Sequence, residues 1–166
     1  GSTIGGCWVD KSYPNVMLQT LKNSYSFSDI PMPKSYSLHP TRDDILKYLN
    51  SYYNHHKLYR YTKFNSTVIL TEWNYTNNYW IITYKNKNKK YKIISKYLCI
   101  CSGFYTTPKI PAFKNIKNYN GKIRHTVDWS YTGKETLDSF RNKKVLVIGN
   151  GPSGCDLACL AVNNKA

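Results

Sequence analysis

The sequence predicts an α/β fold in which an antiparallel β-meander accompanies a strand-turn-helix unit. Two observations lead to this prediction. Three short runs rich in β-branched and aromatic residues lie between residues 67 and 95, separated by Asn-rich turns. Further along, an apolar run at 145–148 leads into the glycine pattern G-x-G-x-x-G at Gly149–Gly154, and a helix-like segment follows. This context is typical of a Rossmann-like dinucleotide-binding turn.

Residues 1–40 show no sustained periodicity and indicate a loop with paired glycines, several prolines and scattered aromatics. A helix is expected to follow, with Thr41 as its N-cap and Asp44 three residues later as the partner of a capping box. Its apolar face should hold the positions that recur at helical spacing, which are Ile45, Leu46, Leu49, Tyr52, Tyr53 and His56. We interpret His55 and His56 as helix-end residues rather than metal ligands, because no His, Cys or carboxylate stands at a metal-like spacing from them.

The strand-like runs of the meander are Thr67–Trp73, Tyr79–Tyr84 and Tyr91–Ser95. Between the last two, the lysine-rich stretch Tyr84–Lys92 is typical of a solvated hairpin tip. A fourth strand is expected at Tyr97–Cys101, before a proline-punctuated connection. A short apolar strand is expected at Lys144–Ile148. The final helix should begin near Ser153 and present one apolar face, made by Leu157, Leu160 and Ala161.

The composition bounds the function classes. A net charge of +15 suggests a nucleic-acid binder, but the excess is mostly lysine and only four arginines are present. The chain is also rich in asparagine, isoleucine and tyrosine, so a general compositional bias explains the many lysines. Nucleic-acid binding is therefore the less favoured alternative. No apolar run reaches the length of about 18 residues that a membrane span needs. Cys99 and Cys101 share one face of an expected strand, which suits buried free thiols and a reducing, cytoplasmic location.

The glycine pattern has a definite chemistry. In such a unit the first glycine permits the tight turn, the second allows backbone to approach a pyrophosphate, and the third brings helix and strand close together. The helix N-terminus then faces the phosphates with free N–H groups and the positive end of its dipole. The alternative is a plain strand-helix turn without a ligand. A complete unit also has an acidic residue or arginine on a second parallel strand about 20 residues later. These residues stop short of it, so we expect an internal piece of a longer protein.

Six segments of the chain, in order, carry a more specific resemblance. They read IGGCW, YPNVMLQTLKNSYSFSDIPMP, HPTRDDILKYLNSYYNHHKL, CICSGFYTTPKIP, YNGKIRHTVDW and VLVIGNGPSGCDLA. Each is similar to a segment that occurs in the same order in flavin-containing monooxygenases. The first resembles the sequence just after that family's FAD-binding glycine turn, and the last resembles its NADPH-binding turn. The resemblance thus places the chain between the two turns, with the FAD turn itself outside it.

The resemblance implies a two-dinucleotide-binding-domain flavoprotein. Residues 1–140 would be a partial FAD-binding domain with the helix and meander, and residues 141–166 the start of an NADPH-binding domain. It further implies an enzyme that uses FAD and NADPH to insert one oxygen atom of O₂ into a small organic substrate through a flavin C4a-peroxide. N- or S-oxygenation is the leading prediction. Baeyer–Villiger oxygenation of a carbonyl is the alternative, which Trp129 after His125 favours and Ser130 does not. The piece alone is expected to be inactive, and neither a metal nor a nucleic acid is implied.

The resemblance also assigns site residues. Gln19 aligns with an active-site amide beside the flavin, although the family's animal-type members carry Asn there. The implied cofactor-binding residues are Gly5, Gly6, Trp8, Thr20, Ser102, Gly103, Gly149, Asn150, Gly151, Pro152, Ser153 and Gly154. His125 lies in a family signature that here begins with Tyr119 in place of Phe. It is interpreted either as an acid-base residue at the flavin or, with more weight, as part of the connection between domains.

Overall fold

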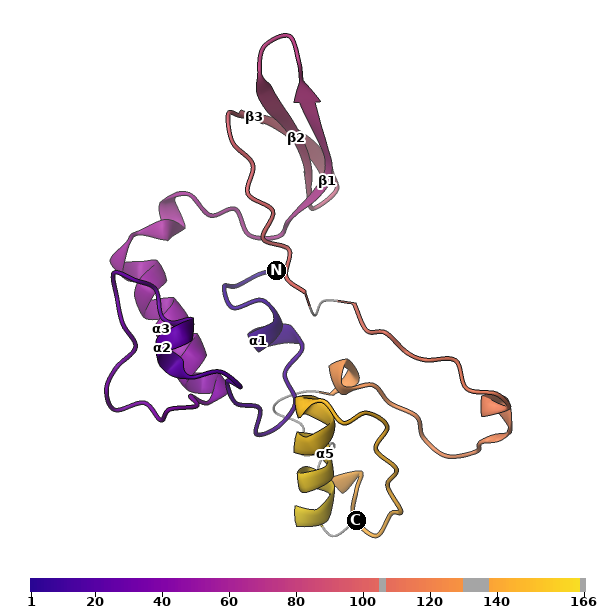
Figure 1. Cartoon of the computed structure of the whole chain (residues 1–166). Helices are drawn as coiled ribbons and strands as arrows, with labels where there is room; N and C mark the ends of the chain where they lie inside the picture. The colour runs from indigo at the N-terminus through magenta and orange to yellow at the C-terminus, as the bar shows by residue number, and fades with distance from the viewer. Residues whose placement is uncertain (105–106, 130–137, 165–166) are drawn as a thin grey trace.

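The computed structural model describes residues 1–104, 107–129 and 138–164 (Figure 1). Its α-helices are α1 (Cys7–Asp10), α2 (Lys22–Tyr25), α3 (Arg42–His55) and α5 (Pro152–Asn163). Single 3₁₀ turns lie at η1 (Leu58–Arg60), η2 (Ile116–Asn118) and η3 (Thr126–Asp128). The strands are β1 (Ser66–Asn74), β2 (Tyr79–Asn86) and β3 (Lys89–Ser95). The segment expected to be a loop, residues 1–40, therefore contains two single-turn helices.

Helix α3 begins where the sequence predicts. Thr41 Oγ1 accepts a hydrogen bond from the Asp44 backbone N–H at 3.2 Å, and the Asp44 carboxylate accepts one from the Thr41 backbone N–H at 3.1 Å. This reciprocal capping box satisfies two N–H groups that a helix start otherwise leaves unpaired. His56 is the C-cap, as expected of a helix-end residue. Its Nε2 lies 2.9 Å from the Asp29 carboxylate, a partner that is distant in sequence.

A first buried cluster packs α3 against the N-terminal loop. Its buried members are Leu18, Met32, Ile45 and Tyr48. Tyr48, which was not among the expected apolar positions, is only 3% exposed. Its hydroxyl donates to the Ile30 carbonyl at 2.6 Å and accepts from the Phe27 N–H at 2.7 Å. These bonds fix the loop over the helix, so the fold of residues 1–40 depends on α3.

The meander is a three-stranded antiparallel sheet in the order β1-β2-β3 that projects from the helical part of the molecule (Figure 1). Its strands match the three predicted runs, with a register shift between Val68 and Leu70. Cross-strand aromatic pairs stabilise it: Trp73 meets Trp80, and Tyr84 stacks on Tyr91 at 5.3 Å between ring centroids. The lysines around the β2-β3 turn are exposed, as predicted for a solvated tip.

Two expected strands are wrong. The runs Tyr97–Cys101 and Lys144–Ile148 carry no strand assignment, and no described segment pairs with either of them. A strand depends on hydrogen bonds to a neighbour, so an apolar run alone does not make one. Cys99 and Cys101 are consequently exposed, and the expectation of buried thiols there is wrong as well. Five free cysteines are present in all.

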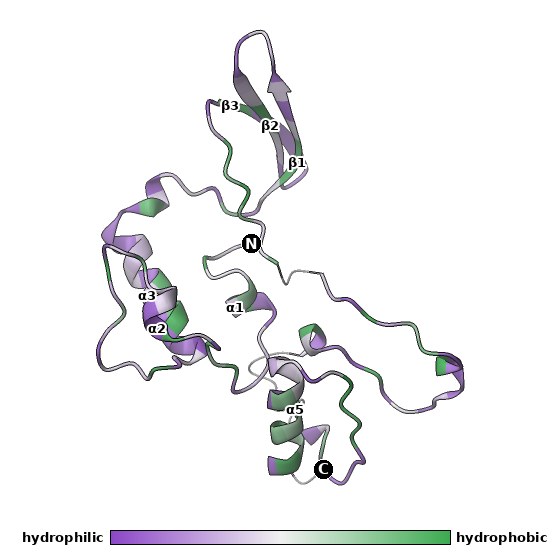
Figure 2. Ribbon diagram, in the orientation of Figure 1, coloured by the Kyte–Doolittle hydropathy of each residue, from purple (hydrophilic) through white to green (hydrophobic). Residues whose placement is uncertain are grey.

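A second buried cluster joins α5 to the N-terminal segment. Its buried members are Tyr13, Trp129, Phe140, Leu160 and Ala161. Figure 2 shows the apolar colouring that runs along α5, and the predicted face residues Leu160 and Ala161 are the ones buried there. Trp129 and Phe140 meet edge to face, with 4.9 Å between ring centroids. Segments from both ends of the described chain therefore share one small core.

Candidate functional site

The turn at Gly149–Gly154 has a backbone that only glycine adopts readily at its first position. Gly149 has a φ of +118°, where a side chain would be strained. Gly151 is the N-cap of α5 with an extended backbone, φ −71°. A Cβ built on either glycine meets no atom within 4 Å, so both face open space. The turn therefore presents bare backbone with room for a ligand to approach.

Gly154 is required for a different reason. A Cβ at this position would collide with the carbonyl oxygen of Gly149 and come within 3.7 Å of Val147 Cγ1. The absence of a side chain thus lets the first turn of α5 lie directly against the segment that precedes it. This is the close helix packing that the third glycine of such a turn provides.

The N-terminus of α5 is suited to an anion. Pro152 occupies the first helical turn, where its missing N–H costs no hydrogen bond, and that turn holds no acidic residue. Gly154 and Cys155 donate their backbone N–H groups to the Gly151 carbonyl, which closes the helix start. With 12 residues, α5 is long enough to have a substantial dipole, whose positive end lies at this turn. Neither Asn150 nor Ser153 places a carboxylate there.

Tyr13 contacts this helix from the N-terminal segment. Its hydroxyl donates to Asp156 Oδ2 at 2.7 Å and lies 3.3 Å from Ser153 Oγ. Burial is the main cause that raises the pKa of Tyr13 to about 12, and the Asp156 carboxylate raises the pKa further, whereas the bond with Ser153 lowers it. Sequence reasoning did not identify Tyr13 or Asp156 as site residues. No local signal joins two positions so far apart.

The second set of predicted residues lies around α1. Gly5 has a φ of +114°, and a Cβ there would lie 2.6 Å from Leu46 Cδ2. Gly6, at φ +51°, is the N-cap of α1 and has open space where a Cβ would stand. The Trp8 indole N–H donates to the Tyr25 hydroxyl at 2.9 Å. The Trp8 side chain is therefore engaged within the protein.

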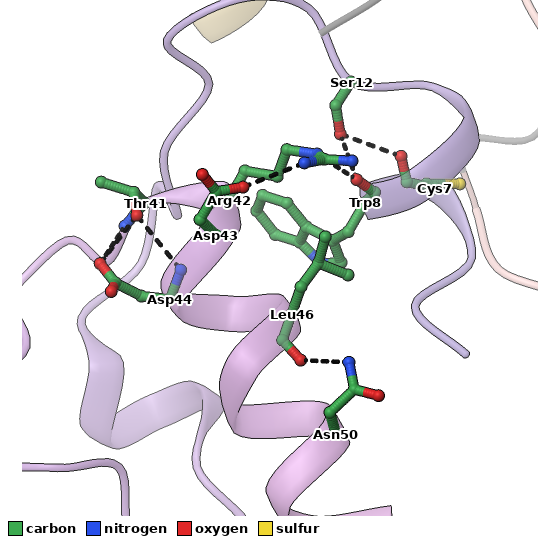
Figure 3. A network of polar contacts seen from close by, with 9 residues as sticks. All are labelled: Cys7, Trp8, Ser12, Thr41, Arg42, Asp43, Asp44, Leu46 and Asn50. Carbon is green, nitrogen blue, oxygen red and sulfur yellow. Dashed lines mark hydrogen bonds and ion pairs between the residues drawn. The ribbon is translucent and has the colours of Figure 1, made fainter. Parts of the chain in front are cut away.

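Side chains from outside α1 bind its carbonyl groups (Figure 3). Arg42 Nε donates to the Trp8 carbonyl at 2.7 Å, while its Nη1 pairs with Asp43 at 3.0 Å. Ser12 Oγ lies within hydrogen-bond distance of the Trp8 carbonyl, 2.8 Å, and of the Cys7 carbonyl, 3.2 Å. This network ties the N-terminal turn to the start of α3.

Gln19 and Thr20 are exposed and follow a segment with fixed backbone. The Leu18 N–H donates to the Pro40 carbonyl at 2.8 Å, and His39 Nδ1 lies 3.0 Å from the Leu18 carbonyl. Within the described residues the Gln19 amide makes no hydrogen bond. The described residues therefore show no bond from the Gln19 side chain to the loop backbone.

Ser102 and Gly103 are exposed, and Gly103 has a φ of +82°. No hydrogen bond within the described ranges joins them to the turn at Gly149–Gly154. The structure thus brings Tyr13 and the glycine turn together, but it leaves the predicted site residues in separate groups.

His125 has a structural role in the connection between the two ends of the chain. Its Nδ1 accepts from the Val127 N–H at 3.3 Å, and its backbone N–H donates to Asp128 Oδ2 at 2.9 Å. The residue therefore caps η3. Trp129, four residues after His125, is 9% exposed and packs in the second cluster, where its buried indole N–H has no hydrogen-bond partner among the described residues. Ser130 lies outside the described residues.

The described residues contain neither a metal-binding cluster nor a membrane-spanning helix. Across residues 1–104, 107–129 and 138–164, no group of three His, Cys, Asp or Glu side chains is placed to hold a metal ion. In the same ranges, no helix has the length and apolar character needed to cross a membrane.

Comparisons with known proteins agree with the resemblance seen in the sequence. A family model described as flavin-binding monooxygenase-like matches residues 7–166. The FAD-binding monooxygenase ktnD of Aspergillus niger is 27% identical over 164 residues, which cover 95% of this chain and 26% of that protein. The N-oxide-forming dimethylaniline monooxygenase 2 of Pan troglodytes is 28% identical over 178 residues, covering 98% of this chain and 32% of that protein.

Solved structures show the same fold. The crystal structure of OTEMO in complex with FAD and NADP superimposes with a TM-score of 0.78 at 22% identity, covering 99% of this chain and 31% of that one. The Rossmann-like flavoprotein fold class is thereby confirmed. The chain spans roughly a quarter to a third of the length of these proteins.

Proposed function

This chain belongs to the flavin-binding monooxygenase-like family, and from that premise we propose that it forms the central part of an FAD- and NADPH-dependent monooxygenase. The enzyme would transfer one oxygen atom of O₂ to a small organic substrate. The Aspergillus niger relative is named as an FAD-binding monooxygenase and the Pan troglodytes relative as an N-oxide-forming one, and the OTEMO complex holds FAD and NADP. Since the chain covers only part of these proteins, the activity would belong to a longer enzyme that includes these residues.

The observation that carries the proposal is the geometry of the turn at Gly149–Gly154. Two glycines face open space, the third packs helix against backbone, and an uncrowded helix N-terminus follows. These features fit the pyrophosphate of a dinucleotide, because backbone N–H groups and a helix dipole stabilise negative charge without a basic side chain. We assign NADPH to this turn, with Gly149, Asn150, Gly151, Pro152, Ser153 and Gly154 as the residues that would hold it.

We assign FAD to the other group of predicted residues: Gly5, Gly6, Trp8, Thr20, Ser102 and Gly103. Gly6 fits this role because its position has open space and a positive φ. Trp8 would act indirectly, since its indole N–H is already bonded to Tyr25. We keep the division into a partial FAD domain, residues 1–140, and the beginning of an NADPH domain, residues 141–166.

The bound cofactors would supply hydride transfer and the activation of O₂. The protein's contribution would be orientation and the exclusion of water. We propose that the Gln19 amide donates a hydrogen bond to the oxygen atom that is transferred. Its exposed position after a fixed backbone segment and its lack of a hydrogen bond within the described residues fit this role. Preorganised donors of this kind stabilise developing negative charge.

For the substrate, we propose a soft nucleophile that undergoes N- or S-oxygenation. The name of the Pan troglodytes relative, an N-oxide-forming enzyme, supports this choice. The ring of Trp129, the residue that favoured a carbonyl substrate, is buried against Phe140. The family assignment does not favour nucleic-acid binding. Five free cysteines fit a reducing compartment, and we propose a cytoplasmic location.

The function is tested by isotope transfer in the full-length enzyme, purified with its flavin. A tertiary amine and a thioether are incubated with NADPH under ¹⁸O₂, and the products are weighed by mass spectrometry. We expect one ¹⁸O atom in the N-oxide or sulfoxide and one NADPH consumed for each product. Oxygen from water, or a purified enzyme without FAD, would contradict the proposal.

A further inference from the structure

We propose that Tyr13 is a positioning residue for NADPH binding, because its hydroxyl fixes the first turns of α5 through Asp156 and Ser153. The choice of nucleotide rests on the proposed function, whereas the positioning itself rests on contacts in the structure. The hydroxyl donates to Asp156 Oδ2 at 2.7 Å and lies 3.3 Å from Ser153 Oγ. These residues are 143 and 140 positions away in the sequence.

Packing explains the ring of Tyr13 but not its hydroxyl. The ring is 5% exposed in the cluster with Leu160 and Ala161, where phenylalanine would fill the same space. A buried hydroxyl has a cost unless it is hydrogen-bonded, so its retention depends on its partners. Both partners lie on α5, and one of them, Ser153, belongs to the glycine pattern itself.

The bond to Asp156 connects the Tyr13 hydroxyl to the glycine turn at the start of α5. Its carboxylate lies one helical turn after the residues that would face the nucleotide, and it forms no ion pair with a described residue. An unconstrained carboxylate there would oppose the negative charge of a pyrophosphate. The Tyr13 hydroxyl stabilises the carboxylate by donating to it and holds it in one orientation, while its contact with Ser153 fixes the helix start. The N–H groups of the turn are thereby kept in place for the phosphates.

The experiment uses Tyr13→Phe in the FAD-loaded full-length enzyme, with NADP⁺ affinity measured by calorimetry. Losing part of a hydrogen bond to a charged group at the helix start should weaken nucleotide binding by roughly fivefold to tenfold. We expect that increase in Kd for NADP⁺ and an unchanged FAD content. In the absence of nucleotide, the amides of residues 153–157 should exchange hydrogen faster.

Tyr48→Phe is the matched control. It removes another buried tyrosine hydroxyl, one that bonds only backbone of the N-terminal loop. It should lower stability without changing the Kd for NADP⁺ or exchange in α5. If the two variants change the NADP⁺ Kd equally, or if Tyr13→Phe leaves exchange at residues 153–157 unaltered, the positioning role is refuted.

Asp156→Ala removes the acceptor of the same hydrogen bond. This variant replaces Tyr13→Phe in the test if Tyr13→Phe does not fold. Positioning predicts weaker NADP⁺ binding, and a double variant no worse than either single one. Simple removal of a negative charge predicts tighter binding, which would overturn the proposal. If wild type binds no NADP⁺ while exchange in α5 still depends on Tyr13, the proposed function fails and the structural part of the inference stands.

Discussion

The two glycine turns of the molecule have a similar φ at their first glycine but differ in their surroundings. Gly5 and Gly149 have φ values of +114° and +118°. At Gly5 a Cβ would lie 2.6 Å from Leu46 Cδ2 and 2.8 Å from Val9 Cγ2, whereas at Gly149 it would meet nothing within 4 Å. The first turn therefore needs glycine for packing as well as conformation, and the second leaves its backbone free for a ligand.

The helices that follow the two turns differ in length and in the side chains that bind them. Helix α1 has four residues, and Arg42 and Ser12 bind its carbonyl groups. Helix α5 has 12 residues, and its side-chain hydrogen bonds with the N-terminal segment come from Tyr13. A glycine pair before a helix is thus weak evidence of a site by itself. Open space at its first glycine and a longer helix distinguish the turn assigned to NADPH from the turn at Gly5.

The largest predicted effect concerns a residue in neither turn. Gln19→Leu should leave both dinucleotides bound and hydride transfer nearly intact. Loss of one preorganised donor costs about 10²-fold in comparable sites, so product per NADPH should fall by about that factor as O₂ is diverted to H₂O₂. Product and H₂O₂ are quantified against NADPH consumed, in the variant and in the wild type side by side. Coupling equal to that of wild type would remove Gln19 from the site.

Gly151→Val tests the open turn. The side chain would occupy the space from which the pyrophosphate approaches, and overpacking of this kind costs about 2 kcal/mol, or roughly 30-fold in affinity. We expect the KM for NADPH to rise by that factor while FAD content stays the same. Loss of FAD with an unchanged KM for NADPH would exchange the assignments of the two turns.

Gly5→Ala tests the packed turn. Alanine at this φ is strained by about 1–2 kcal/mol, and its methyl group would also overlap Leu46 Cδ2 and Val9 Cγ2. Thermal unfolding should shift downward by several degrees, with the NADPH KM unchanged. An altered KM for NADPH with unchanged stability would mean that the turn at Gly5 takes part in NADPH binding.

The smallest predicted effect is a pH dependence at the contact between Tyr13 and α5. The pKa of Tyr13 is about 12 in the folded chain, above the ordinary 10.0, so folding favours the neutral hydroxyl. Its stabilising contribution is complete below pH 10 and is lost as the pH rises from 10 to 12. The difference in unfolding free energy between wild type and Tyr13→Phe should therefore shrink over this range. A difference that stays constant would show that the hydroxyl keeps its ordinary pKa.

Local signals made much of the fold predictable. The capping box at Thr41 placed the start of α3, alternating and aromatic runs placed the meander, and the glycine pattern placed α5. The predictions of strands at Tyr97–Cys101 and Lys144–Ile148 were wrong because a strand needs a neighbouring strand to pair with. A single apolar run does not show whether such a neighbour exists. The burial of Tyr48 was not predicted, because the sequence of the helix does not show which loop carbonyl the Tyr48 hydroxyl binds.

The candidate site was predictable only in part, for a related reason. The glycine turn is contiguous, so its geometry could be inferred from six neighbouring residues. The contact between Tyr13 and Asp156 joins two ordinary residues across almost the whole chain, and only the folded structure brings them together. The ligand roles of Gln19, Thr20, Ser102 and Gly103 remain predictions.

The assignment of NADPH to the turn at Gly149–Gly154 is tested most directly by hydrogen exchange on the FAD-loaded enzyme, with and without NADP⁺. Backbone N–H groups that bind a pyrophosphate should exchange more slowly. We predict slower exchange at the amides of residues 149–151 and 153–155 on addition of NADP⁺, and no change at Gly5–Trp8. Protection at Gly5–Trp8 with none at residues 149–155 would contradict the assignment.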